Sequence, residues 1–313
     1  MDFLGILFGI ILLSHGGDVL TKSSVDLSLK FSVPKIIIGM TVVSFATSAP
    51  ELIVSLNATL NGFSSFAVGN VIGSNIANIG LVLGIIIIIY PITLQNRFYN
   101  SDFPILMIST FLFYILLTTG SRISRIEGII LLVSICVILI YLFIYQKKNI
   151  SEFSDINDIS SISVPKSVFY VFFSGLLLWL GSETLIKSSI SVANEYGISE
   201  RVISISMVAI GTSIPELAAS VVASIKKQND LSIGNLIGSN IFNLLVVIGI
   251  TSTVMPIEII DSKIIFSDML WVVFFSALIL PLAYLRRRNV LTRKKGIILL
   301  MLYLIFIIPL LVN

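Results

Sequence analysis

Long apolar segments follow one another along almost the whole sequence, and they restrict the fold more than any other feature. Of the 313 residues, 56% are hydrophobic and only 12% are charged, and the mean hydropathy is +1.04. Ordinary globular chains carry about 25% charged residues, so the composition excludes an ordinary soluble domain. A membrane-spanning helix needs about 20 mostly apolar residues. We therefore predict an all-α integral membrane protein with ten transmembrane helices, near residues 2–21, 36–60, 66–90, 103–119, 126–145, 166–187, 201–225, 231–255, 267–285 and 296–312.

The basic residues predict how these helices are oriented. Fifteen of the 20 lysines and arginines follow odd-numbered spans, and five follow even-numbered spans. Cytoplasmic loops are the ones enriched in lysine and arginine. We therefore expect a multi-pass protein of the cell membrane with both termini extracellular and the polar linker 146–165 cytoplasmic. The basic run "RRRNVLTRKK" at 286–295 is one of these loops, and we expect no nucleic-acid partner.

The sequence also repeats itself with a constant offset of 165 residues. "TSAPE" ends at Glu51 and "TSIPE" ends at Glu216, while "GNVIGSNIAN" begins at Gly69 and "GNLIGSNIFN" begins at Gly234. Each half holds five predicted spans, and an odd number forces the second half to enter the membrane upside down. The expected result is two inverted-topology five-helix repeats, 1–145 and 166–313, whose equivalent residues meet near the membrane midplane.

The first repeated motif places a full negative charge inside each half. A charged side chain at membrane depth costs at least about 2.5 kcal/mol and marks an ion or proton pathway. Glu51 and Glu216 have no lysine or arginine near them in their own segments. Pro50 and Pro215 each remove a backbone donor, which can leave carbonyl oxygens free. Carboxylates, hydroxyls and carbonyls form an all-oxygen set that suits hard cations such as sodium and calcium.

The second repeated motif adds hydroxyls and amides on one helix face. Ser74 and Asn78 are four residues apart, as are Ser239 and Asn243, and residues four apart are neighbours on a helix. Small and polar residues in membrane helices most often only pack helices together. Beside two intramembrane carboxylates, however, the same residues favour a cation site.

Several functions are compatible with such a site. A cation antiporter fits best, and a proton/calcium exchanger is its neighbour, since the glutamates could carry protons. A cation channel is a different class, but an inverted repeat with a midplane site favours alternating access. An intramembrane enzyme is disfavoured, because the single Cys136 and the single His15 provide no catalytic pair and no histidine metal cluster. We expect no catalytic residues and no cofactor, with the ions as substrates and the lipid bilayer as surroundings.

The paired motifs "TSAPELIVS" with "GNVIGSNIAN" and "GTSIPELAAS" with "GNLIGSNIFN" resemble the alpha repeats of the cation/calcium exchanger superfamily, most closely those of prokaryotic sodium/calcium exchangers. The resemblance extends over nearly the whole chain. It implies a sodium/calcium antiporter in which the sodium gradient drives calcium across the membrane. It also implies that the first and sixth helices slide against the other eight, and we expect a functional monomer.

The resemblance implies a set of ion ligands. Calcium would be held by Glu51, Glu216 and the carbonyls of Thr47 and Thr212. Sodium would use the glutamates with Ser48, Ser74, Ser213 and Ser239 and the carbonyls of Ser44 and Ala209, while Asn78 and Asn243 would line the middle of the site.

Three positions depart from the family pattern. Ala46 stands where glycine is usual, and Ser44 stands where alanine is common. Asn243 stands where potassium-dependent members carry aspartate. The asparagine leaves only two carboxylates in the site and predicts that transport does not require potassium.

Overall fold

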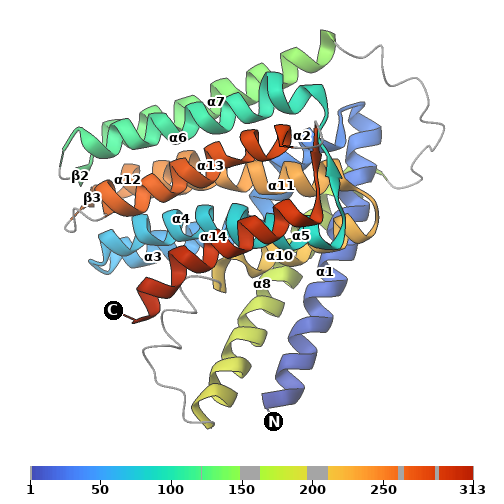
Figure 1. Cartoon of the computed structure of the whole chain (residues 1–313), viewed down its shortest axis with the longest axis horizontal. Helices are drawn as coiled ribbons and strands as arrows, with labels where there is room; N and C mark the ends of the chain where they lie inside the picture. The colour runs from blue at the N-terminus through green and yellow to red at the C-terminus, as the bar shows by residue number, and fades with distance from the viewer. Residues whose placement is uncertain are drawn as a thin grey trace.

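The structure is a computed structural model, and it describes residues 2–120, 122–148, 163–195, 211–259, 264–285 and 289–312. Nearly all of these residues are helical, and most helices run side by side in one bundle, while α1 and α8 cross it obliquely and extend beyond it (Figure 1). The helical part of the predicted fold class is therefore confirmed. Predicted span 201–225 is described only from Gly211 onward, and most of the linker 146–165 lies outside the described residues.

The first half contributes most of its helices in pairs joined by π-helical turns. Its elements are α1 (Asp2–Phe31), α2 (Lys35–Ile38), η1 (Gly39–Val43), α3 (Ser44–Leu60), α4 (Ser64–Ala77), η2 (Asn78–Leu83), α5 (Gly84–Ile89), β1 (Ile92–Thr93), η3 (Phe98–Asp102), α6 (Phe103–Thr118), β2 (Arg122–Ile123) and α7 (Arg125–Lys148).

The second half follows the same order. Its elements are α8 (Val164–Glu195), η5 (Gly211–Ser213), α10 (Ile214–Ile225), α11 (Asn229–Phe242), η6 (Asn243–Val247), α12 (Ile248–Val254), β3 (Ile257–Glu258), η7 (Ile264–Asp268), α13 (Met269–Tyr284), β4 (Val290–Leu291) and α14 (Arg293–Val312).

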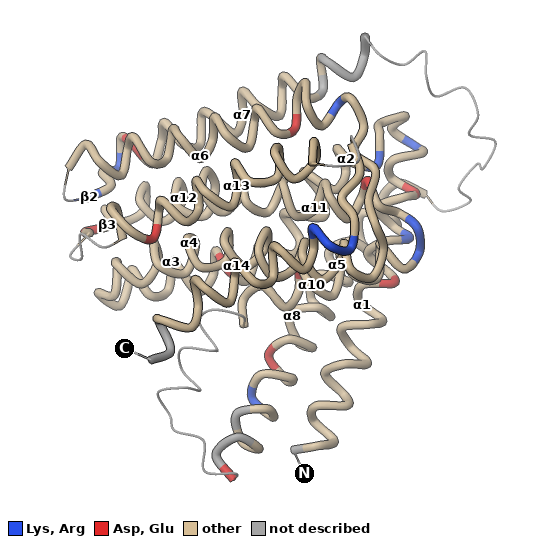
Figure 2. The backbone as a smooth tube through the Cα atoms, in the orientation of Figure 1, with Lys and Arg blue, Asp and Glu red and all other residues tan. Residues whose placement is uncertain are grey.

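Within the described ranges, eight helical segments are long and apolar enough to cross a membrane. They coincide with eight of the predicted spans, and the protein is a multi-pass membrane protein. The two other predicted spans correspond to the shorter apolar helix Gly211–Ile225 and to α14. That all ten cross the membrane stays a prediction. Lysines, arginines and acidic residues gather mainly at helix ends and in connections (Figure 2).

The first helix is longer than the sequence predicted. The predicted span ends near residue 21, whereas α1 continues to Phe31. The extension buries Leu27. Its first charged residue, Lys22, lies 2.8 Å from Asp18 one turn earlier, and Asp18 also forms an ion pair with Lys226 at the end of α10. Pairing at this spacing lets a helix carry charges beyond its apolar run.

The two repeated prolines lie in different helical contexts. Pro50 lies inside α3, which continues on both sides of it. Pro215 lies in the first turn of α10, directly after a 3₁₀ turn. Proline is tolerated in a first helical turn because the missing donor would have no helical partner there. The expected loss of a helical hydrogen bond inside a helix therefore applies to Pro50 but not to Pro215.

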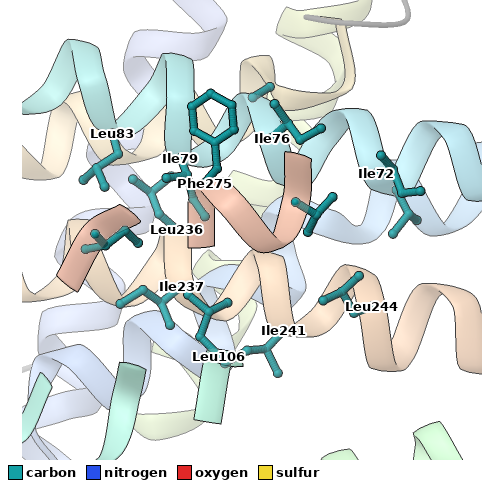
Figure 3. Close-up of a cluster of buried hydrophobic side chains, with 14 of the residues drawn as sticks. Ile72, Ile76, Ile79, Leu83, Leu106, Leu236, Ile237, Ile241, Leu244 and Phe275 are labelled. Carbon is teal, nitrogen blue, oxygen red and sulfur yellow. The ribbon is translucent and has the colours of Figure 1, made fainter. Parts of the chain in front are cut away.

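One apolar core joins the two halves. Ile72, Ile76 and Ile79 from the first half pack in the same buried cluster as Leu236 and Phe275 from the second half (Figure 3). Two antiparallel strand pairs also connect the halves, since β1 pairs with β4 and β2 pairs with β3. Each strand has only two residues, and the sequence did not predict them, because two residues are too few to show an alternating pattern.

Two glycines of α11 allow its backbone to lie close to the backbone of α2 and η1. A Cβ atom added at Gly238 would lie 2.5 Å from the Cα atom of Met40 and 2.6 Å from its carbonyl oxygen. A Cβ atom at Gly234 would lie 2.3 Å from the carbonyl oxygen of Ile36. Only glycine lets α11 pack this closely against α2 and η1.

We expect Gly238→Ala to destabilise the protein by about 1–3 kcal/mol, the usual effect of overpacking. The methyl group would meet backbone atoms of η1, which cannot rotate away. The midpoint of thermal unfolding in detergent measures the loss. Gly120→Ala, in an exposed connection, is the control. Equal midpoints for the two variants would contradict this account.

Candidate ion-binding site

The two intramembrane carboxylates are completely buried. Glu51 on α3 and Glu216 on α10 each have 0% exposure. Ser74 donates to Oε1 of Glu51 at 3.2 Å. Ser48 and Ser239 donate to Oε1 of Glu216 at 3.0 and 3.4 Å. Since Ser48 belongs to the first half, one carboxylate is held by both halves of the chain.

Hydroxyl contacts join the surroundings of each carboxylate to the opposite half of the chain. The hydroxyl oxygens of Ser74 and Ser213 are 3.2 Å apart, and those of Thr47 and Ser239 are 3.4 Å apart. Both pairs cross from one half to the other. When both carboxylates are ionised, their like charges repel each other. The structure thus brings together the carboxylates and hydroxyls that the sequence singled out.

Asn78 and Asn243 lie beside this cluster at equivalent places, each as the first residue of a π-helix. Both side chains are completely buried. Asn78 donates from Nδ2 to Oδ1 of Asn240 at 3.0 Å, and Asn243 donates from Nδ2 to Oδ1 of Asn75 at 3.2 Å. The π-helix adds one residue to a turn, a feature frequent at functional sites.

Among the predicted site residues, four buried side-chain oxygens accept no hydrogen bond from the described residues: Oε2 of Glu51, Oε2 of Glu216, Oδ1 of Asn78 and Oδ1 of Asn243. They form two pairs of repeat-equivalent atoms. Buried polar atoms are nearly always partnered, so four free acceptors at equivalent positions indicate a bound group that provides positive charge. Carboxylate and amide oxygens suit a hard cation.

No basic side chain neutralises the carboxylates within the part of the chain that the structure describes. Its salt bridges involve Asp18, Asp102 and Glu183, not Glu51 or Glu216. The described residues also contain no cluster of three or more His, Cys, Asp or Glu side chains. A cation at this site would therefore be held by two carboxylates and by neutral oxygens.

Three further predicted residues were expected to bind through their backbone carbonyls, and that of Ser44 accepts from the hydroxyl of Thr47 at 3.4 Å. The hydroxyl of Ser44 lies within bonding distance of the carbonyls of Gly39 and Asn235, at 2.8 and 2.9 Å, so the described bonds of this hydroxyl go to backbone. Thr212 is only partly buried, and its hydroxyl donates to Asn70 at 3.4 Å. Ala209 lies outside the described residues.

Sequence reasoning missed a surrounding layer of amides. Asn235 accepts from Thr47 at 3.1 Å and donates to Ser220 at 2.9 Å. Its equivalent, Asn70, accepts from Thr212 and donates to Ser55 at 3.1 Å. The offset of 165 residues was the signal that could have identified them, because it relates each of these bonds to its counterpart.

Asn75 and Asn240 also belong to the missed layer, although both lie in the repeated motif. Each donates from Nδ2 to the backbone carbonyl of the other, at 3.3 and 3.2 Å. The two residues are 165 positions apart and exchange identical bonds. A reciprocal contact between equivalent residues is typical of a local two-fold relation between two copies.

Fold and site together define a helical membrane protein with a buried, all-oxygen, acidic site built from two equivalent sets of residues. A sequence model of the family described as "Sodium/calcium exchanger protein" matches residues 1–144 and 166–312. The chain belongs to this family, and the resemblance drawn from its motifs is confirmed.

Individual relatives agree with the family match. The sodium/calcium exchanger MaX1 of Methanosarcina acetivorans is 28% identical over 348 residues, covering 99% of this chain and 98% of the relative. The inner membrane protein YrbG of Escherichia coli is 32% identical, covering 81% of this chain and 80% of the relative. A structure of the sodium-calcium exchanger NCX_Mj superposes with a TM-score of 0.81 at 30% identity, covering 98% of this chain and 99% of the other.

We expect Asn235→Ala to destabilise the folded protein by about 1–3 kcal/mol, because it removes one hydrogen bond from each of two buried hydroxyls. Asn70→Ala, at the equivalent position, should behave alike. Thermal unfolding in detergent measures both. The exposed Asn61 provides a control, and Asn61→Ala should change stability by less than about 0.5 kcal/mol. A stable Asn235→Ala variant would argue against a structural role for the amide layer.

Proposed function

We propose that the protein is a sodium/calcium antiporter, in which the sodium gradient drives calcium across the membrane through the site around Glu51 and Glu216. The observation that carries the proposal is the set of four buried oxygens without a hydrogen-bond donor, two from carboxylates and two from amides. Family membership supports it. The named relative MaX1 is itself a sodium/calcium exchanger.

Charge balance is the physical reason for exchange at one site. Two buried carboxylates without a basic partner carry two negative charges, which one divalent ion or two monovalent ions can neutralise. Calcium takes six to eight oxygens in flexible geometry. The free oxygens of Glu51, Glu216, Asn78 and Asn243 provide part of this shell, and the carbonyls of Thr47 and Thr212 are proposed to add to it.

Sodium ions are proposed to occupy the same cluster with more of its hydroxyls. Ser48, Ser74 and Ser239 already contact the carboxylates, and a hydroxyl can keep donating to a carboxylate while its lone pairs face a cation. The carbonyls of Ser44 and Ala209 are proposed as further ligands. Because both kinds of ion need the same two glutamates, binding of one excludes the other, which couples their movement.

The proposed topology has ten membrane-spanning helices in two inverted repeats, 1–145 and 166–313, joined by a cytoplasmic linker at 146–165, with extracellular termini. Support comes from the loop charges and from the matched bonds 165 residues apart. Asn75 and Asn240 exchange reciprocal bonds, as expected if a two-fold axis in the membrane plane relates the repeats.

Alternating access is proposed to involve α1 and α8. These helices pack mainly along each other and cross the remaining bundle (Figure 1). Gly9 and Gly181 permit the close contact, since a Cβ atom at Gly9 would lie 2.9 Å from the carbonyl oxygen of Gly181. A pair of helices that packs chiefly on itself can move as one body against the rest. We further propose that the protein acts as a monomer and catalyses no chemical reaction.

Glu51→Gln and Glu216→Gln should each abolish calcium transport while the protein still inserts and folds. Glutamine keeps the oxygen that accepts from serine but removes the charge that a cation requires. Calcium uptake into proteoliposomes measures the loss, and thermal unfolding confirms the fold. Glu183→Gln on α8, where the carboxylate is exposed and pairs with Lys187 at 3.0 Å, is the matched control. Normal transport by either site variant would refute the assignment.

Imposing a gradient of one ion at a time tests which ion is exchanged for calcium. Vesicles loaded with sodium should take up radioactive calcium, and replacing internal sodium with choline should stop the uptake. External or internal potassium should have no effect, because Asn243 adds no third carboxylate to the site. Uptake that follows a pH gradient and ignores sodium would favour proton/calcium exchange instead. Calcium flux that needs no counter-ion at all would favour a channel.

A further inference from the structure

The amides of Asn78 and Asn243 could face the site with either end. An asparagine side chain presents an oxygen acceptor on one side and an NH₂ donor on the other. Only the oxygen can bind a cation, and an NH₂ group in its place would repel one. A site that relies on these two residues must therefore fix which end points inward.

The orientation of each amide can be traced to a backbone atom. The carbonyl oxygen of Asn240 can only accept, so Asn75 must turn its Nδ2 toward it, at 3.3 Å. Oδ1 of Asn75 then lies on the other side and accepts from Asn243 at 3.2 Å. Asn243 must therefore use its NH₂ group there, which leaves its own Oδ1 free.

An equivalent set of contacts, starting from the backbone of Asn75, orients the amide of Asn78. The carbonyl oxygen of Asn75 accepts from Nδ2 of Asn240 at 3.2 Å. Oδ1 of Asn240 accepts from Nδ2 of Asn78 at 3.0 Å, and Oδ1 of Asn78 is left free. Turning over any one of these amides would place two acceptors together, and a backbone carbonyl cannot turn over to compensate.

We propose that Asn75 and Asn240 are positioning residues, each of which orients the site asparagine of the opposite half so that its oxygen faces the cation. The proposal rests on the proposed function in that the ligand is taken to be a transported cation. It assigns a role to two residues that are not themselves ligands. Outer partners that orient ligands commonly change metal affinity by about 10-fold or more when removed.

The two site asparagines should differ in how strongly their orientation is fixed. Asn243 has a second acceptor, because its Nδ2 also lies 3.3 Å from the hydroxyl oxygen of Ser74. Among the described residues, the amide of Asn78 donates to Asn240 alone. Removing Asn240 should therefore free the amide of Asn78 more completely than removing Asn75 frees the amide of Asn243.

A double-mutant cycle tests the proposal by measuring the KM for calcium in sodium-loaded proteoliposomes. Asn240→Ala should raise this KM by about 10-fold, and Asn75→Ala should raise it by less. Asn240→Ala should have no further effect in an Asn78→Ala background, because the amide that it orients is gone. It should keep its full effect in an Asn243→Ala background, since Asn78, the residue that Asn240 orients, is still present.

A rescue variant separates positioning from a general loss of structure. In Asn78→Asp both ends of the side chain are oxygens, so orientation no longer matters. Asn240→Ala should then not raise the KM of the Asn78→Asp protein, because it also removes Oδ1 of Asn240, the acceptor that would face the aspartate. The corresponding pair, Asn75→Ala with Asn243→Asp, gives a second test if Asn240→Ala does not fold.

The outcomes are distinct. An equal rise in KM in every background, or no rise at all, would overturn the positioning role. If the unmodified protein shows no sodium-dependent calcium uptake, the proposed function fails. In that case the same cycle, measured as equilibrium binding of calcium to the detergent-solubilised protein, still decides whether Asn240 acts through Asn78.

Discussion

The mutual repulsion of two buried carboxylates is the constraint on which the rest of the site depends. Glu51 and Glu216 are fully buried, and within the described structure neither has a basic partner. Burying an unpaired charge is costly, and two such charges add repulsion to that cost. The surrounding side chains reduce the cost only partly, because serine hydroxyls donate to one oxygen of each carboxylate. A proton or a positive ion is the remaining source of compensation, and we propose that the site receives an ion.

The internal duplication allows oxygens to surround the site from more than one side. A cation needs oxygens on several sides, whereas one helix offers only one face. Here each half supplies a carboxylate, hydroxyls and an amide, and each half also satisfies polar groups of the other, as Thr47 does with Asn235. The buried amides and hydroxyls would be costly in a membrane interior if they lacked partners. Their matched bonds both hold the halves together and keep the ligand oxygens available.

The sequence predicted the carboxylates and hydroxyls because charge in an apolar segment is costly and therefore informative. The offset of 165 residues then located the second copy of every motif residue. It did not separate ligands from their supports, since Asn75 and Asn78 are equally polar and only the fold shows which oxygen is left free. The predicted first span stopped before the full length of α1 because apolar length alone does not show that a helix continues past Lys22, which pairs with Asp18. The strands and the 3₁₀ turn before Pro215 depend on contacts between distant segments.

The exchange of bonds between Asn75 and Asn240 has a consequence for how the molecule is made. When a ribosome has delivered the first half to the membrane, the acceptor for Asn75 is still 165 residues away in the growing chain. Until the second half has been inserted, the side chain of Asn75 lacks both of its partners, whereas Glu51 and Asn70 already have Ser74 and Ser55 within the first half. The last polar bonds of the centre can therefore close only after the second half has reached the membrane.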